Sequence, residues 1–148
     1  MVDVVPCPNC RSKLVLLPPG FPLFDVQCTR CMFRAQVKTA RCAPPRDQIF
    51  GAGWDVLDKT RKTGQLIPPL IVNFQWPDKA NGKERQVVYF FPFLTKDNIK
   101  KRQRSAAGQR PGYKEFNYVG LRDDNMPRMM LFPTSRRRRS AKEADPTS

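Results

Sequence analysis

Apolar and polar residues alternate with a period of two over Phe33–Thr39, and this pattern predicts a strand. Before it, Lys13–Leu17 and Leu23–Gln27 are short, mostly apolar segments on either side of the turn residues Pro18-Pro19-Gly20, and they predict two short strands. We therefore expect a hairpin followed by a third strand in this part of the chain.

Two longer stretches in the middle of the chain are more continuously apolar. Leu70–Gln75 and Gln86–Phe91 are rich in β-branched and aromatic residues and are connected by a segment that contains Asn81-Gly82, so they predict a buried hairpin of the main sheet. Two further short strands are expected near Phe116–Val119 and Met129–Phe132.

One segment, Gln48–Lys62, has apolar residues at mostly helical spacings, and Gly64 follows it as a stop signal. The apolar positions are Ile49, Ala52, Trp54, Val56 and Leu57. Gly51 and Gly53 lower helix propensity by about 1 kcal/mol each, which indicates close packing rather than ligand contact. This segment is the one main helix that the sequence predicts. Trp54 and Trp76 are assigned to the core.

Four of the five cysteines form two Cys-x-x-Cys pairs, Cys7 with Cys10 and Cys28 with Cys31. Two pairs at this spacing predict a tetrahedral four-thiolate zinc site. Two disulfides are the alternative, but the N-terminal residues lack the basic start and apolar core of a secretory signal. Because four thiolates fill the coordination sphere, the zinc is expected to be structural. Cys42 is expected to be a small buried side chain, with a reactive thiol as the alternative.

The composition points to a polyanionic partner. The 148 residues contain 27 Lys and Arg against 13 Asp and Glu, a net charge of +14. Nucleic acid is the first candidate partner, ahead of an anionic membrane surface, and no stretch of the sequence is suited to span a bilayer. The chain contains no histidine, which excludes Ser-His-Asp hydrolases, HExxH proteases and nucleases with a histidine base. We expect a cytoplasmic location; the oligomeric state is left open.

The segment after the predicted hairpin concentrates positive charge and is expected to contact DNA phosphates, although a solvated face is the alternative. Its candidate DNA-binding residues are Lys96, Lys100, Lys101, Arg102, Arg104 and Arg110. Residues 135–148 form a polar tail that contains Arg136–Arg139 and is expected to be disordered. The predicted organisation is therefore one domain over residues 1–134 and a basic tail.

Three polar residues around the second cysteine pair are expected to share one patch. Gln36 and Lys38 are two apart on a predicted strand and so project from the same face. Asp25 lies on the strand that enters the Cys28–Cys31 turn, and folding back places it nearest residue 34, within a few ångströms of Gln36. The sequence thus gathers a carboxylate, an amide and an ammonium. Solvated surface groups are the simpler interpretation of the same residues.

These motifs resemble, in order, the catalytic core of the DpnI and Dam-replacing family of restriction endonucleases. The matching elements are CPNC, Pro22-x-x-Asp25, CTRC, QVK (Gln36–Lys38), GAGWDVL (Gly51–Leu57), the hairpin from Leu70 to Phe93, and Ser105–Leu121 with Ala106, Gly112 and Gly120-Leu121. The resemblance implies an α/β fold, restriction-endonuclease-like (PD-(D/E)XK), with a mixed sheet, one main helix and an inserted four-cysteine zinc ribbon. The family's C-terminal winged-helix domain has no counterpart in this sequence.

The resemblance also implies roles. Asp25, the Gln36 side-chain carbonyl and the Val37 backbone carbonyl would hold magnesium or manganese against a scissile phosphate of duplex DNA, and Lys38 would orient or deprotonate the attacking water. The implied activity is that of a restriction-type endonuclease, with the recognition sequence and the dependence on methylation left open.

One departure from the family pattern leaves the function open between two classes. Gln36 stands where the family has Glu, so the expected metal site loses one negative charge. The alternative function is therefore a non-enzymatic zinc-ribbon protein that binds nucleic acid.

Overall fold

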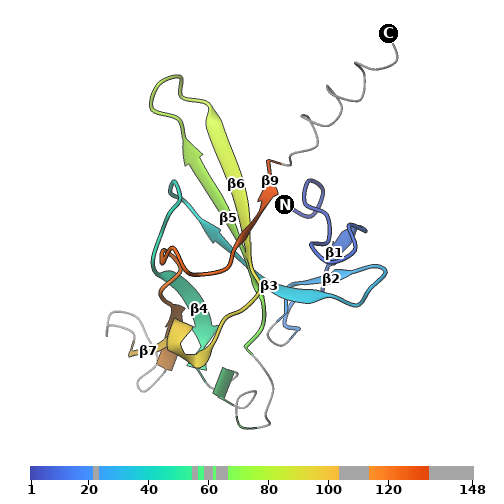
Figure 1. Cartoon of the computed structure of the whole chain (residues 1–148), viewed down its shortest axis with the longest axis vertical. Helices are drawn as coiled ribbons and strands as arrows, with labels where there is room; N and C mark the ends of the chain where they lie inside the picture. Colours follow the sequence, from blue (N-terminus) through green and yellow to red (C-terminus); the bar gives the residue numbers. More distant parts are fainter. Residues whose placement is uncertain (22–23, 55–56, 59–61, 63–66, 104–113, 134–148) are drawn as a thin grey trace.

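The computed structural model describes residues 1–21, 24–54, 57–58, 62, 67–103 and 114–133. Strands dominate these residues and form two sheets (Figure 1). The larger sheet has six strands in the order β1-β2-β3-β5-β6-β9, and the smaller has three in the order β4-β8-β7. The strands are β1 (Leu14–Leu16), β2 (Val26–Cys28), β3 (Arg34–Ala40), β4 (Ile49–Gly53), β5 (Leu70–Pro77), β6 (Glu84–Phe91), β7 (Ile99–Gln103), β8 (Lys114–Tyr118) and β9 (Met129–Phe132).

The six-stranded sheet is mixed. Strand β1 pairs antiparallel with β2, and β2 pairs antiparallel with β3, as expected for an N-terminal segment that folds back on itself twice. Strand β3 then pairs with β5 in parallel, with Gln36 opposite Leu70 and Lys38 opposite Val72. Strands β5 and β6 form the predicted hairpin, with Leu70 opposite Phe91, and β9 adds antiparallel to β6. Strand β3 therefore joins the cysteine-containing hairpin to the main hairpin.

The predicted helix over Gln48–Lys62 is wrong in its first third. Ile49–Gly53 form strand β4, which pairs antiparallel with β8. Among the described residues of this segment, helical backbone occurs only at Trp54, Leu57, Asp58 and Lys62. The β-branched and aromatic side chains at the start of the segment favour a strand once a partner strand is available, and the early glycines disfavour a helix. The chain is thus a mixed α/β protein with very little helix in the part described.

Gly51 is required by packing, as the sequence predicted. A Cβ atom at this position would lie 2.6 Å or less from three ring atoms of Phe116. The Phe116 side chain is fully buried and packs edge-on against Tyr118, with 5.2 Å between the ring centroids. The absence of a side chain on Gly51 therefore lets β4 lie directly against the aromatic residues of β8.

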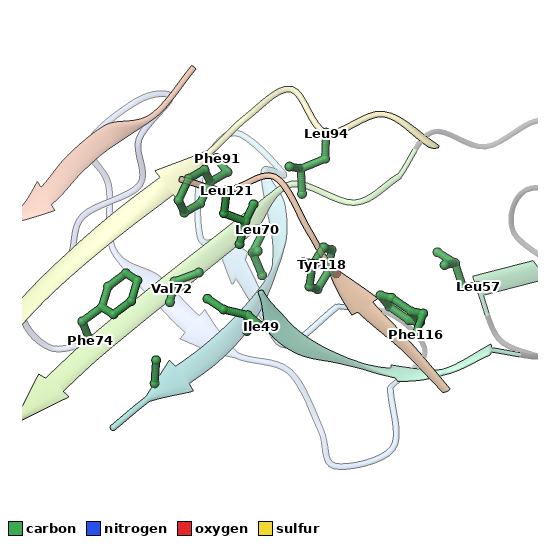
Figure 2. Packing of buried hydrophobic residues seen from close by; sticks show 11 residues of the cluster. Ile49, Leu57, Leu70, Val72, Phe74, Phe91, Leu94, Phe116, Tyr118 and Leu121 are labelled. Carbon is green, nitrogen blue, oxygen red and sulfur yellow. The ribbon is translucent and has the colours of Figure 1, made fainter. Parts of the chain in front are cut away.

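The two faces of the six-stranded sheet carry separate hydrophobic clusters. One face packs against the small sheet, and Figure 2 shows side chains of β5 gathered with side chains of β4 and β8. Trp54 and Trp76 are partly buried at the edge of this cluster. The other face packs against the N-terminal segment and includes Cys7 and Cys28. The cysteine-rich region is therefore part of the protein core.

Strand β7 was not predicted as a strand, because its five residues include three consecutive basic side chains. Its pairing with β8 places it at the edge of the small sheet, where charged residues are tolerated. Residues 134–148, which include the predicted tail, lie outside the described residues. No helix in the described part of the chain is long and apolar enough to cross a membrane.

Candidate functional site

The two Cys-x-x-Cys segments fold into matching turns. The backbone N–H of Cys7 donates to the carbonyl of Ser12 at 2.8 Å, and that of Cys28 donates to Phe33 at 2.7 Å. The residue after each pair, Arg11 or Met32, adopts a positive φ of 67° or 66°. Two local segments of different sequence thus have the same backbone conformation, which turns both sulfurs of each pair toward one centre.

The four sulfurs of Cys7, Cys10, Cys28 and Cys31 lie within 4.8 Å of one another. The closest cross-pair distances are 3.6 Å between Cys7 and Cys31 and 3.4 Å between Cys10 and Cys28. All of these cysteines are free. Zinc–sulfur bonds of about 2.3 Å in a tetrahedron place the sulfurs about 3.8 Å apart. The cluster is therefore compatible with a structural metal such as zinc.

N–H groups donate hydrogen bonds to the sulfurs, and such bonds favour the thiolate forms of Cys10 and Cys31. The backbone N–H of Arg30 donates to the Cys28 sulfur at 3.3 Å, and the Asn9 side chain donates to Cys31 at 3.4 Å. Hydrogen bonds to Ser12 lower the pKa of Cys10 to about 6, and the Asn9 bond lowers the pKa of Cys31. Burial raises the pKa of Cys7 to about 12, so a bound cation would be needed to ionise it.

Cys42 takes no part in this cluster. Its side chain packs against the hydrophobic cluster between the sheets but is only partly buried, so the prediction of a small buried side chain is met in part. The Arg46 guanidinium donates to its sulfur at 3.6 Å.

Asp25 lies where the pairing of β2 with β3 ends. The last paired residues are Val26 and Ala35, and the Asp25 backbone N–H still donates to the Ala35 carbonyl at 3.0 Å. The Asp25 carboxylate then accepts the N–H of Val37 at 2.7 Å. Asp25 therefore lies beside Gln36. The sequence had placed it nearest residue 34, and this was wrong because β2 pairs two residues farther along β3 than expected. The Asp25 side chain is exposed and its direction is fixed by its bond to Val37.

Gln36 faces the interior between the sheets. Its side chain is only 5% exposed, and its Oε1 atom accepts a hydrogen bond from the hydroxyl of Tyr118 in β8. Burial, and next the charge of Asp25, raise the pKa of Tyr118, so the phenol remains a donor at neutral pH. The predicted amide carbonyl is therefore present beside Asp25, but Tyr118 already occupies one of its acceptor positions.

Lys38 lies on the same face of β3 as Gln36 and is partly buried. Burial lowers the pKa of its ammonium group, and the nearby charge of Asp25 opposes that shift. The Nζ atom lies 5.5 Å from the centre of the Phe50 ring of β4. Asp25, Gln36, Lys38 and Tyr118 are hereafter called the Asp25 cluster.

No sequence pattern marked Tyr118 as a site residue. It is 82 residues from Gln36 in the chain, and its alternation within β8 marks it only as a core residue. Pairing of β8 with β4 and packing of the small sheet against β3 bring it to the cluster.

Four of the six candidate DNA-binding residues lie in the described part of the chain. Lys96 lies in a 3-10 turn (Lys96–Asn98), and Lys100, Lys101 and Arg102 lie on β7; all four are exposed. The Lys101 ammonium lies 4.9 Å from the centre of the Trp54 ring. Arg104 and Arg110 lie outside the described residues.

The chain matches no protein-family model and no curated protein. The family resemblance described from the sequence motifs therefore remains a hypothesis.

We expect the purified protein to carry one zinc ion per chain. Cys28→Ser should abolish zinc binding and unfold at least Val4–Thr39, because the cluster links both turns to the core; the thermal midpoint should fall by roughly 10 °C or more. Elemental analysis and thermal unfolding measure both effects. Cys42→Ser is the matched control and should retain the metal. A folded protein prepared without chelator that contains no zinc would contradict this prediction.

Proposed function

We propose that this protein is a zinc-stabilised, DNA-binding endonuclease that hydrolyses DNA phosphodiesters with magnesium or manganese, in the manner of restriction enzymes. The fold is proposed to be restriction-endonuclease-like. The observation that carries the proposal is the convergence of the Asp25 carboxylate, the Gln36 amide and the Lys38 ammonium at the junction of β2 and β3.

The sheet order around this junction supports the proposal. An antiparallel hairpin, β2 with β3, supplies the three residues, and β3 continues into a parallel pairing with β5. This arrangement places the exposed Asp25 carboxylate just before β2 and the partly buried Lys38 ammonium on the face of β3 that carries Gln36. Neither side chain belongs to the cysteine cluster, so both are free to take part in a second site.

The donor set suits a hard divalent cation. Asp25 offers the carboxylate oxygen that does not bond Val37, Gln36 offers an amide oxygen, and Val37 offers its backbone carbonyl; oxygen ligands of this kind are those that magnesium prefers. The cation would polarise the phosphate and lower the pKa of a bound water. Lys38 would orient or deprotonate the attacking water and, when protonated, offset charge that develops on the phosphate.

The basic strand supplies the proposed contact with the duplex backbone. Lys100, Lys101 and Arg102 are consecutive and exposed on the edge strand β7. Lys100 lies in the same row of the small sheet as Phe50, whose ring is adjacent to the Lys38 ammonium. A duplex bound along β7 would thus approach the Asp25 cluster across this sheet. Phosphate contacts position the duplex without selecting its sequence.

A second candidate function is a non-enzymatic nucleic-acid-binding module stabilised by zinc. Gln36 is neutral and buried, and its oxygen accepts the Tyr118 hydroxyl. This bond satisfies the side chain without a cation. The observation favours a site that has lost catalysis while the fold and the basic surface remain.

Binding to duplex DNA should weaken by about tenfold to a hundredfold between about 50 and 200 mM salt, because a few phosphate contacts release counterions. Lys100→Glu combined with Lys101→Glu should weaken binding by at least about tenfold more, equally for all sequences. Fluorescence anisotropy with labelled duplexes measures both effects.

The control for this experiment is Lys79→Glu combined with Lys83→Glu. These two exposed lysines lie at the tip of the β5–β6 hairpin, far from β7 in Figure 1, and their substitution changes the net charge equally. Affinity that is independent of salt, or equal losses in both double variants, would count against β7 as the DNA contact.

Asp25→Ala and Lys38→Ala should each lower plasmid cleavage by at least about a hundredfold, with zinc content and DNA binding retained. Asp124→Ala and Lys83→Ala, which alter exposed side chains elsewhere, are the matched controls. Methylated and unmethylated plasmids, each with magnesium or manganese, show whether cleavage depends on methylation.

Gln36→Glu separates the two candidate functions. A carboxylate here adds a full charge beside Asp25 and can still accept the Tyr118 hydroxyl, so it should tighten divalent-cation binding and raise or create cleavage. If the wild-type protein and the folded, DNA-binding Gln36→Glu variant both fail to cleave with every cation, the endonuclease proposal is wrong and the binding module is the better account.

A further inference from the structure

A cavity of about 210 Å³ opens on the same face of the six-stranded sheet as Gln36 and Lys38. Three aromatic side chains, Phe74 of β5 and Tyr89 and Phe91 of β6, line it. Phe74 and Tyr89 pack edge to face, with 6.1 Å between their centroids. The segment Pro44–Arg46 and the residues Leu121 and Arg128 complete the walls.

The volume of about 210 Å³ limits the enclosed part of a ligand to roughly one ring system. A cavity of about 150 Å³ holds one benzene molecule, whereas sites for drug-sized ligands begin at about 300 Å³. The observed cavity lies between these values and so fits one heterocyclic ring system. Phe74 and Phe91 are almost fully buried and form the floor of the cavity, whereas Tyr89 is only partly buried and is the aromatic side chain with surface left for stacking.

Two exposed arginines give the cavity a strong positive charge. The Nε atom of Arg46 donates to the carbonyl of Gln48 at 2.9 Å, and Nη1 of Arg128 donates to that of Leu121 at 3.0 Å. Each guanidinium is thus held by the backbone while most of its five N–H groups are left for other acceptors. Among the described residues, neither arginine forms an ion pair with a carboxylate.

The cavity lies close to the Asp25 cluster. Lys38 is opposite Val72 of β5, and Val72 is opposite Tyr89 of β6. Two interstrand spacings therefore separate Lys38 from Tyr89, a distance of about 10 Å between backbones. That distance corresponds to about three nucleotide steps along one strand of a duplex.

An aromatic lining beside two arginines is complementary to a base that carries a phosphate. We infer that this cavity binds one nucleotide turned out of a nucleic-acid strand, with its base against Tyr89 and its phosphate on Arg46 and Arg128. Guanidinium groups pair with phosphate through two parallel hydrogen bonds, and bases stack on aromatic rings without regard to sequence. The inference rests on the proposed function only in taking nucleic acid as the partner.

Titration of the wild-type chain with small probes tests the two-part recognition. Deoxyadenosine 5′-monophosphate should bind at least about tenfold more tightly than deoxyadenosine or inorganic phosphate, and should shift the NMR signals of the Tyr89 ring and the Leu121 methyl groups. Arg128→Gln should remove this preference for the monophosphate. Arg122→Gln, an equal charge change at an exposed neighbouring residue, should preserve it.

A second measurement tests whether the nucleotide belongs to a strand. A duplex with one unpaired nucleotide should bind about tenfold more tightly than a fully paired duplex of equal length, because no base pair has to open. Arg46→Gln and Arg128→Gln should abolish this difference while zinc content is retained.

The outcomes separate this inference from the proposed function. If the chain cleaves paired DNA while the monophosphate leaves the Tyr89 and Leu121 signals unmoved, or if phosphate alone binds equally well, the cavity inference is overturned and the endonuclease proposal stands. If the monophosphate and the unpaired nucleotide are preferred but no DNA is cleaved, the cavity inference stands and the endonuclease proposal fails.

Discussion

The hydrogen bond from the Val37 N–H to the Asp25 carboxylate fixes the position of that carboxylate beside Gln36. The bond itself depends on the turn between β2 and β3. Asp25 precedes Cys28 by three residues, and Val37 follows Cys31 by six, so the geometry of this cysteine turn determines whether the two groups meet. A hydrogen bond to a charged group contributes roughly 1.5–3 kcal/mol. That is too little to order a hairpin alone, whereas a bound structural metal contributes about 10 kcal/mol or more. A metal bound by the cysteine cluster would therefore hold the carboxylate in place.

Strand β3 links this hairpin to the rest of the molecule through the Gln36 side chain. The Tyr118 hydroxyl of the small sheet donates to the buried Gln36 amide of β3. This hydrogen bond forms only when the two sheets are packed together, and it then sets the orientation of the amide. A neutral amide suits this buried position because its oxygen is satisfied by the phenol. A carboxylate would carry the desolvation cost of a buried charge unless a cation compensated it. The same contact thus explains why a neutral glutamine fits this buried position.

Local patterns predicted much of the fold, and pairing over long distances accounts for what they missed. Strand β9 matches its predicted bounds, and the cysteine cluster followed from spacing alone. Ile49–Gly53 has helical apolar spacing but forms β4, because β8, more than sixty residues later, supplies its partner. The approach of Asp25 to Gln36 was predictable because the turn between them is short. Tyr118 was not, since its position depends on how two sheets pack.

The most direct test of this account is hydrogen exchange at the Val37 amide in zinc-loaded and zinc-stripped protein. In the loaded protein, the Val37 amide should exchange slowly, because its proton is held by the Asp25 carboxylate. Removal of zinc should abolish this protection, while Phe91, which is buried in the β5–β6 hairpin on the face away from the cysteines, should remain protected. Unchanged protection of Val37 after complete removal of zinc would contradict the claim that the metal site positions the Asp25 cluster.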